Sequence, residues 1–413
     1  MAENRHYLRA LALAVVGSAL FFGAGNLLID PYGLFQLVSR SGFNAVKPRP
    51  DHSLAEIKMA TVLKYPANAL IIGNSRAEIG FDPQHPVWRS QSLSAYNLAV
   101  PGSGIQNSAE QIKQLENKLH PRLVLLGLDF LDFLVNPSST ENPPPAHDQF
   151  DLRDRMRLGF ASLFSIQAAA DSLRTLRIQR DATPESITDR GFNPLLDYQP
   201  IARSEGYYAM FRQRAQSNAQ RFARMPKGLF KNGSKSSPEW EALTAILEET
   251  LNRGGSVKIV IYPYHAQLLA MFEQYQLWPA FEAWKAHVAE VAQAVLDRHS
   301  GRIELWDFSG FSDYQCEPIP RKGDKQSVVR GYWEAGHFKK ELGDVMLTRM
   351  FDRRENSNPA ADRIFGMPLT TANLEQNAAR VRSERETCLA HSPEIFSEAL
   401  ELKKSTKPVT APL

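Results

Sequence analysis

The chain has 413 residues, a length that favours one large domain with an insertion, or two domains. Apolar residues make up 43% of the chain and charged residues 23%, so it can build an ordinary hydrophobic core. The net charge of +3 is small for this length. It argues against a dedicated nucleic-acid-binding protein, which would show a concentrated basic stripe.

The first feature along the chain is an uncharged apolar run from Ala10 to Ile29. About 20 residues with a rise of about 1.5 Å each cross a bilayer core of about 30 Å. A cleaved signal peptide is the alternative, with Gly23-Ala24-Gly25 imitating a cleavage site, although its apolar core would normally be shorter. We therefore expect residues 1–33 to form a retained membrane anchor.

Basic residues on both sides of this run bear on its orientation. Arg5 and Arg9 lie directly before it and favour a cytoplasmic N-terminus. Arg40, Lys47 and Arg49 follow it, but at a greater distance from the apolar run. Because the closer pair should weigh more, we expect the bulk of the chain to lie outside the cytoplasm.

Short apolar segments alternate with helical patterns through the rest of the chain. Helices are expected between Gly104 and Leu119 and over residues 277–298. Strands are expected at residues 69–72, 96–100, 123–128, 257–262 and 302–306. This alternation indicates βαβ units and an α/β fold with a mostly parallel sheet.

The spacing of the strands predicts the domain organisation. A first part of the sheet domain is expected at 34–136, a mostly helical insertion at 137–245 and the second part at 246–355. A polar C-terminal extension covers 356–413, and its Lys-, Thr- and Pro-containing tail is expected to be disordered.

The insertion is rich in arginine. It is either a solvated helical face or a cap over the functional site that meets an anionic polymer or lipid headgroups. The arginines are Arg153, Arg155, Arg157, Arg174, Arg177, Arg180, Arg212, Arg214, Arg221 and Arg224.

The two cysteines, Cys316 and Cys388, allow two interpretations. An oxidising compartment would permit a disulfide between them, and otherwise they are unrelated thiols. Their spacing does not match a metal-binding motif.

Several residues with chemical potential lie just beyond predicted strands. Ser75 follows the first strand, Gly102 the second and Asp129 the third, while His337 lies beyond the fifth with Glu334 three residues before it. Each has a structural explanation when taken alone: a helix N-cap for the serine, a turn for the glycine, an exposed helix start for Glu334 and His337. Together they favour a site, because ligands of open parallel sheets bind at the carboxyl ends of the strands.

These segments resemble the SGNH/GDSL hydrolase superfamily, specifically its membrane-anchored bacterial branch. That branch includes proteins similar to alginate O-acetylation factors and to the teichoic-acid D-alanylation protein. The resemblance covers about residues 30–350 discontinuously. It is carried by Gly73-Asn74-Ser75-Arg76, by Gly102 at the end of Asn97-Leu98-Ala99-Val100-Pro101-Gly102, by Glu334-Ala335-Gly336-His337 with Phe338 and Gly343, and by the opening Asp30-Pro31-Tyr32-Gly33.

The resemblance implies a flavodoxin-like three-layer SGNH fold and a role for each residue. Ser75 is the expected nucleophile, His337 its base and Glu334 the carboxylate that orients the histidine. The backbone N–H groups of Ser75 and Gly102 are the expected oxyanion donors.

Two positions depart from the family pattern. Glu334 stands where Asp is usual, and a glutamate can still orient a histidine. Asp129 stands where an oxyanion-binding Asn is usual, and an ionised carboxylate would repel the developing charge. Asp129 is therefore protonated, points away, or serves the alcohol acceptor. On the sequence alone, if the protein is an enzyme, replacing it with Asn is expected to be tolerated or to raise esterase activity. A large loss of activity would instead mean that the carboxylate itself is used, to orient a substrate hydroxyl or to pair with an arginine such as Arg76.

The sequence thus predicts an acyl esterase or O-acyltransferase, tethered in the bacterial inner membrane with its bulk in the periplasm, that acts on a cell-envelope glycan. Its expected partners are that membrane, an envelope polysaccharide and a membrane protein that donates the acyl group, with no cofactor and no metal. The main alternative, which Asp129 favours, is a non-catalytic SGNH-like glycan-binding subunit of a polysaccharide assembly or modification complex. A plain lipid esterase is less favoured, because the sequence shows nothing like an acyl-chain tunnel.

Overall fold

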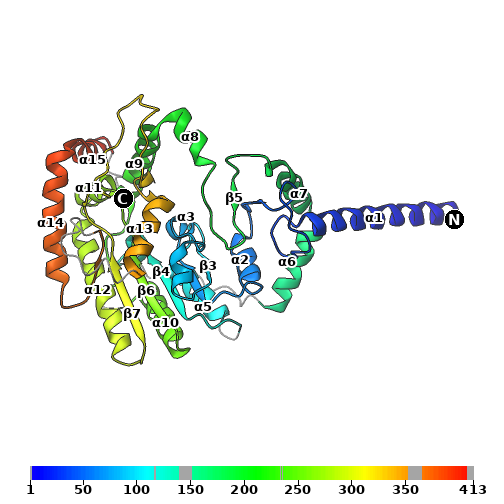
Figure 1. The fold of residues 1–413 in the computed structure, drawn as a ribbon, viewed down its shortest axis with the longest axis horizontal. Coiled ribbons are helices and arrows are strands. Elements are labelled where there is room, and N and C mark those ends of the chain that lie inside the picture. The colour runs from blue at the N-terminus through cyan, green and yellow to red at the C-terminus, as the bar shows by residue number, and fades with distance from the viewer. Residues whose placement is uncertain are drawn as a thin grey trace. The chain divides into compact units, whose positions relative to one another are not determined.

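The computed structural model describes residues 2–115, 118–138, 151–232, 234, 236–351 and 365–406 (Figure 1). The chain divides into two compact units: Met1–Tyr65 with Asp148–Asp197, and Pro66–His147 with Tyr198–Leu413. This division differs from the predicted boundaries. Residues 34–65 belong with the anchor, and the predicted insertion 137–245 contributes to both units.

The first unit is built around the N-terminal helix α1, at the base of which α6 and α7 lie (Figure 1). Residues His6–Ile29 of α1 are long and apolar enough to cross a membrane, as the sequence predicts. Its elements are α1 (Ala2–Ile29), β1 (Lys47–Pro48), α2 (Leu54–Val62), α6 (Leu152–Phe164), α7 (Ile166–Ile178) and β5 (Ser186–Ile187), with β1 and β5 antiparallel.

Hydrogen bonds hold the turn Asp30-Pro31-Tyr32-Gly33 that follows α1 and satisfy carbonyls left open at the helix end. The Asp30 carboxylate accepts the N–H groups of residues 34–36 at 2.7–2.9 Å. Lys47 donates its Nζ to the carbonyls of Ile29 and Asp30 at 3.1 and 2.6 Å. The Tyr32 hydroxyl donates to Asp171 of α7 at 2.6 Å and so ties the turn to that helix.

The second unit contains the sheet and most of the helices. Its strands are β2 (Ala69–Ile72), β3 (Ala95–Asn97), β4 (Leu123–Leu128), β6 (Ser256–Ile261), β7 (Arg302–Asp307), β8 (Tyr332–Glu334), β9 (His337–Phe338) and β10 (Met367–Pro368). Its helices are α3 (Ser75–Gly80), α4 (Pro86–Ser90), α5 (Ile105–Gln114), the 3₁₀ turn η1 (Phe130–Phe133), α8 (Tyr198–Glu205), α9 (Tyr207–Arg224), α10 (Pro238–Asn252), α11 (Ala266–Gln274), α12 (Trp278–Leu296), α13 (Lys340–Phe351), α14 (Leu374–His391) and α15 (Pro393–Ser405).

The central sheet has the order β10-β7-β6-β4-β2-β3. Strands β3, β2, β4, β6 and β7 are parallel, and β10 runs antiparallel to β7 at the edge. The predicted α/β class with a mostly parallel sheet is therefore confirmed. Every residue of β2 and β4 is buried, as expected for strands covered on both faces.

The chain reverses direction across the sheet at β2. From β2 it moves outward to β3, then returns past β2 to β4, β6 and β7. Because such crossovers are right-handed, helices on the two sides of this reversal cover opposite faces. These helices form two groups. Helix α10 packs between α5 and α12, and in the other group α13 packs against α3 and α4 (Figure 1). The reversal falls between β2 and β4, and in open parallel sheets ligands bind at the carboxyl ends of the two strands at such a point.

Two helices of the polar C-terminal extension pack on this unit. Helix α15 contacts α9 and α11, and α14 leads into it. Cys388 of α14 is buried and forms a disulfide with Cys316, which settles the two interpretations of these cysteines in favour of a bond. Most of the Lys-, Thr- and Pro-containing tail, residues 407–413, lies outside the described residues.

Candidate active site

Ser75 stands on the turn between β2 and α3. Gly73 precedes it with φ 142°, and a Cβ at this glycine would lie 2.6 Å from the Tyr262 hydroxyl, so the turn requires glycine. Asn74 caps α3, its side-chain oxygen accepting the Arg76 N–H at 3.1 Å. The capping role that could have explained Ser75 therefore belongs to its neighbour, and the serine is the first residue of the helix.

His337 meets Ser75 across 262 positions of sequence: its Nε2 lies 2.8 Å from the serine Oγ. The histidine stands on the short antiparallel hairpin of β8 and β9, not at an exposed helix start. Its other ring nitrogen, Nδ1, hydrogen-bonds to the Glu334 carboxylate. The three side chains form a serine–imidazole–carboxylate chain, the arrangement that activates a hydroxyl nucleophile.

Glu334 is buried and held in its ionised form. Its Oε2 accepts the Gly336 N–H at 2.7 Å, and Arg214 of α9 places its Nε 3.1 Å from Oε1. Burial acts to raise the pKa of this carboxyl, but His337, Arg214 and the Gly336 N–H outweigh it and hold the pKa at about 2. A carboxylate that stays charged stabilises an imidazolium formed beside it.

Arg76 joins three parts of the site. Its Nε donates to the Gly336 carbonyl at 2.6 Å, and its Nη1 forms an ion pair with Asp129. The guanidinium also lies 5.2 Å from the Tyr264 ring centre, within cation–π range. Since Arg76 follows Ser75 directly, these contacts hold the serine turn against the histidine hairpin and against the end of β4.

Asp129 points into this network. Besides Arg76, its carboxylate accepts the Tyr264 hydroxyl at 2.7 Å, the Asn74 amide at 3.1 Å and the Leu131 N–H at 3.2 Å. Four donors thus surround this buried carboxylate. The carboxylate is thus turned toward an arginine, the pairing that the sequence offered in case the Asp129 carboxylate itself is used.

Asp132 is a second carboxyl of this region. The Asn74 amide also reaches its Oδ2, at 3.5 Å. Burial, together with the charge of Asp129, raises the pKa of Asp132 from 3.8 to about 8. With this pKa, Asp132 carries a proton at neutral pH, whereas its neighbour Asp129 has Arg76 as a partner.

Gly102 lies on the turn after β3, beside the serine turn. Past the ends of the strands, the Val100 N–H still donates to the Gly73 carbonyl at 3.0 Å and keeps the two turns adjacent. Among the described residues, neither the Ser75 nor the Gly102 backbone N–H donates to a protein acceptor. Both N–H groups are therefore available to donate to a ligand at the carboxyl ends of the strands, beside Ser75.

The sequence prediction gave no role to three side chains of the site, Asn74, Arg76 and Tyr264, except that it named Arg76 as a possible partner of Asp129. The first two flank Ser75 within the quoted motif, and the tyrosine follows β6 at the same carboxyl edge of the sheet. Arg214 was noted only as one arginine in a basic region, because sequence does not tell which arginine of a helix contacts a distant glutamate.

No family model matches the chain, and no curated protein sequence matches it. Within the part of the chain that the structure describes, no group of three or more His, Cys, Asp or Glu side chains is placed to hold a metal ion. The argument for function therefore depends on the geometry around Ser75.

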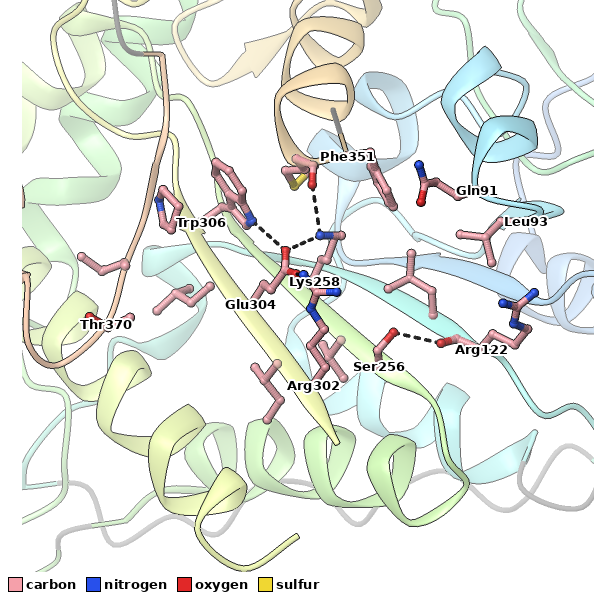
Figure 2. Close-up of a pocket in the computed structure, with 17 residues that line it drawn as sticks. Gln91, Leu93, Arg122, Ser256, Lys258, Arg302, Glu304, Trp306, Phe351 and Thr370 are labelled. Atoms are coloured by element: carbon pink, nitrogen blue, oxygen red, sulfur yellow. Dashed lines mark hydrogen bonds and ion pairs between the residues drawn. The ribbon is translucent and has the colours of Figure 1, made fainter. Parts of the chain in front are cut away.

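A cavity of about 590 Å³ lies elsewhere on this unit (Figure 2). Its lining includes Arg122, Ser256 and Arg302, at or near the amino-terminal starts of β4, β6 and β7. Inside it, Lys258 pairs with Glu304, and Figure 2 shows both side chains turned toward each other. The serine site is at the opposite, carboxyl edge of the same strands, so this cavity does not adjoin it.

Proposed function

We propose that the protein is an acyl esterase or O-acyltransferase of the SGNH type that acts on a cell-envelope glycan through Ser75, His337 and Glu334. The observation that carries the proposal is the 2.8 Å contact between the Ser75 Oγ and the His337 Nε2, with Glu334 behind the ring. A hydroxyl needs such a base to become a nucleophile at neutral pH.

The strand order supports an SGNH-like, flavodoxin-like fold. Numbering only the parallel strands along the chain, the sheet reads 2-1-3-4-5, the flavodoxin order. In that order the switch point lies between the first and third strands, here β2 and β4. Ser75 follows β2, and Asp129 follows β4, so the serine and its arginine-linked carboxylate flank the place where this fold binds ligands.

In the first half-reaction, the Ser75 Oγ attacks the carbonyl carbon of the acyl donor as its proton passes to His337 Nε2. Glu334 keeps the ring oriented and balances the imidazolium charge. The oxyanion of the tetrahedral intermediate is bound by the backbone N–H groups of Ser75 and Gly102. The intermediate collapses, the bond to the leaving oxygen breaks, and that oxygen takes the proton from His337, leaving an acyl-serine.

In the second half-reaction, His337 removes a proton from water or from a sugar hydroxyl, which attacks the acyl-serine. The new tetrahedral intermediate expels the Ser75 oxygen, and the serine recovers its proton from the histidine. Water gives net hydrolysis, whereas a glycan hydroxyl gives O-acyl transfer. In either case the acceptor enters at the carboxyl ends of the parallel strands, beside Ser75.

The proposed place of this chemistry is the periplasmic face of the inner membrane. An apolar helix of membrane-spanning length precedes the fold, and Arg5 and Arg9 favour a cytoplasmic start for it. The Cys316–Cys388 disulfide fits an oxidising compartment outside the cytoplasm. A membrane protein that supplies the acyl group is the expected partner of a transferase so placed.

The proposal is tested by rapid mixing of the full-length protein with an aryl acetate. A burst of phenolate with an amplitude close to one per protein, absent from Ser75→Ala and His337→Ala and retained by the exposed-serine control Ser90→Ala, supports an acyl-serine. A burst followed by little turnover indicates a transferase that lacks its acceptor. If no variant differs from wild type, and wild type shows neither burst nor turnover while a glycan still binds, the protein is a binding subunit instead.

A further inference from the structure

An unusual surface runs along α6 and the start of α7 in the first unit. Four apolar residues of α6 recur every fourth position and are exposed, and Ile166 continues them at the start of α7. The surface, here called the apolar stripe, consists of Leu152 (68% exposed), Met156 (66%), Phe160 (67%), Phe164 (42%) and Ile166 (91%). Soluble proteins rarely leave such a continuous apolar patch in water, so the stripe calls for an occupant.

The stripe is continuous with the apolar helix α1. The Asn26 amide of α1 donates to the Leu163 carbonyl at 2.8 Å, and the Ser172 hydroxyl donates to the Asn26 side chain at 2.7 Å. Gly23 makes this close packing possible, since a Cβ there would lie 2.6 Å from the Phe164 ring. Helices α6 and α7 are thereby joined to the final turns of α1 (Figure 1).

The position along α1 sets the depth of the stripe. Gly23 lies six residues before the helix end at Ile29, which corresponds to about 9 Å along the axis. Interfacial amphipathic helices bury their apolar face about 5–10 Å below the headgroup level. Where α1 crosses a bilayer, the turn between α6 and α7 therefore reaches the boundary between headgroups and acyl chains.

Arginines accompany the stripe on both helices. Arg153, Arg155 and Arg157 on α6, Arg177 on α7 and Arg180 just after α7 are exposed. Arg174 is excluded from this group because it pairs with Glu185 and Asp51. Apolar residues flanked by exposed arginines are the composition of a helix that lies in the interface of an anionic bilayer.

We propose that α6 and the start of α7 form an interfacial membrane-docking element that inserts the apolar stripe into the bilayer, with its arginines on anionic lipid headgroups. Together with α1 it makes two attachments to the membrane. The element fixes the orientation of the first unit on the bilayer surface, which a single spanning helix alone does not. This inference rests on the part of the proposed function in which α1 spans a membrane, and it does not depend on the chemistry of Ser75.

The test uses full-length protein carrying Ile166→Cys labelled with an environment-sensitive fluorophore, in vesicles of phosphatidylethanolamine and phosphatidylglycerol. Val328→Cys is the matched control, because Val328 is a 64% exposed apolar residue of the second unit. We expect doxyl-labelled lipid to quench the fluorophore at position 166. Aqueous iodide should quench the fluorophore there several-fold more slowly than the fluorophore at position 328. Resistance of the protein to alkaline carbonate extraction separately establishes that α1 is inserted.

Two results would overturn the proposal when α1 is inserted. Equal iodide quenching at positions 166 and 328 would show that the apolar stripe is exposed to water. Protection from iodide without quenching by doxyl lipid would place a second copy or another protein on the stripe. The headgroup contact is checked by replacing Arg153, Arg155 and Arg157 with Gln, or by omitting phosphatidylglycerol. Each change should bring iodide quenching at position 166 toward the control rate, and no effect of either change would refute the contact.

Discussion

Arg76 is the residue on which the geometry of the site most depends. It is largely buried, it follows Ser75, and it contacts both the Asp129 carboxylate and the Gly336 carbonyl of the histidine hairpin. An arginine suits this position because its planar guanidinium donates in several fixed directions. A buried arginine without its carboxylate would be an uncompensated charge, so Asp129 and Arg76 act as a pair.

The Asp129→Asn substitution should therefore be harmful, contrary to the expectation from sequence alone. Removing one partner of a buried ion pair typically costs about 3–5 kcal/mol. We expect the free energy of unfolding to fall by about this amount, with a parallel loss of the acylation burst, as measured by urea unfolding and rapid mixing. An Arg76→Met, Asp129→Asn double variant should be less destabilised than the sum of the single variants. Additive effects would show that the pair is not coupled.

Asp132 gives a prediction about pH. The folded state raises its pKa from 3.8 to about 8, so its protonated form stabilises the fold below pH 3.8 and this contribution is lost as the pH rises toward 8. Asp132→Asn cannot ionise and should be more stable than wild type at pH 7, by on the order of 2–4 kcal/mol. The difference should shrink toward pH 4. Asp189→Asn, at an exposed carboxylate, is the control, and a pH-independent difference for Asp132→Asn would contradict the account.

At the scale of secondary-structure elements, the C-terminal helices brace the helix that reaches the triad. Glu398 of α15 pairs with Arg212 of α9 at 2.7 Å, and two residues further along α9 Arg214 contacts Glu334. The Cys316–Cys388 bond ties α14 to the loop after β7. The extension is thus coupled to the site through α9, although its composition suggested only a polar appendage.

Opening the disulfide tests this coupling. The bond closes a loop with a sequence separation of 72, and removal of a native disulfide typically costs about 2–5 kcal/mol. We expect Cys316→Ser, Cys388→Ser protein to unfold at lower urea by that amount and to show a smaller burst rate, since α9 loses its support. An unchanged burst rate in the folded double variant would disconnect the extension from the site.

The sequence predicted the elements whose pattern is local and missed those that depend on distant partners. Strands β2 and β4 are uninterrupted apolar runs, and their predicted bounds at 69–72 and 123–128 match those observed. The short strands β8 and β9 had no such signal, because Glu334 and His337 are placed by contacts with distant residues such as Ser75 and Arg214. The same reason explains why the Asp129 side chain could be located by sequence but not oriented.

For the whole molecule, the central expectations are membrane attachment and an extracytoplasmic fold. Helix α1, which is long and apolar enough to cross a membrane, ends at Ile29, and Asp30 turns the chain directly afterwards. Alkaline phosphatase fused after Gly33 should therefore be active in a bacterial host, because the fusion point would lie in the periplasm. Mass spectrometry of the purified protein should find no new N-terminus near Asn26. Inactive fusions alongside active cytoplasmic reporters would reverse the orientation.

The most direct test of the central claim is covalent labelling of the full-length protein with a fluorophosphonate, followed by peptide mass spectrometry. This reagent phosphonylates an activated serine and needs neither the acyl donor nor the glycan acceptor. We predict one adduct, on Ser75, that disappears in His337→Ala and persists in Ser90→Ala. An unlabelled Ser75 in folded wild-type protein, or labelling that is the same in His337→Ala, would contradict the serine–histidine–glutamate site.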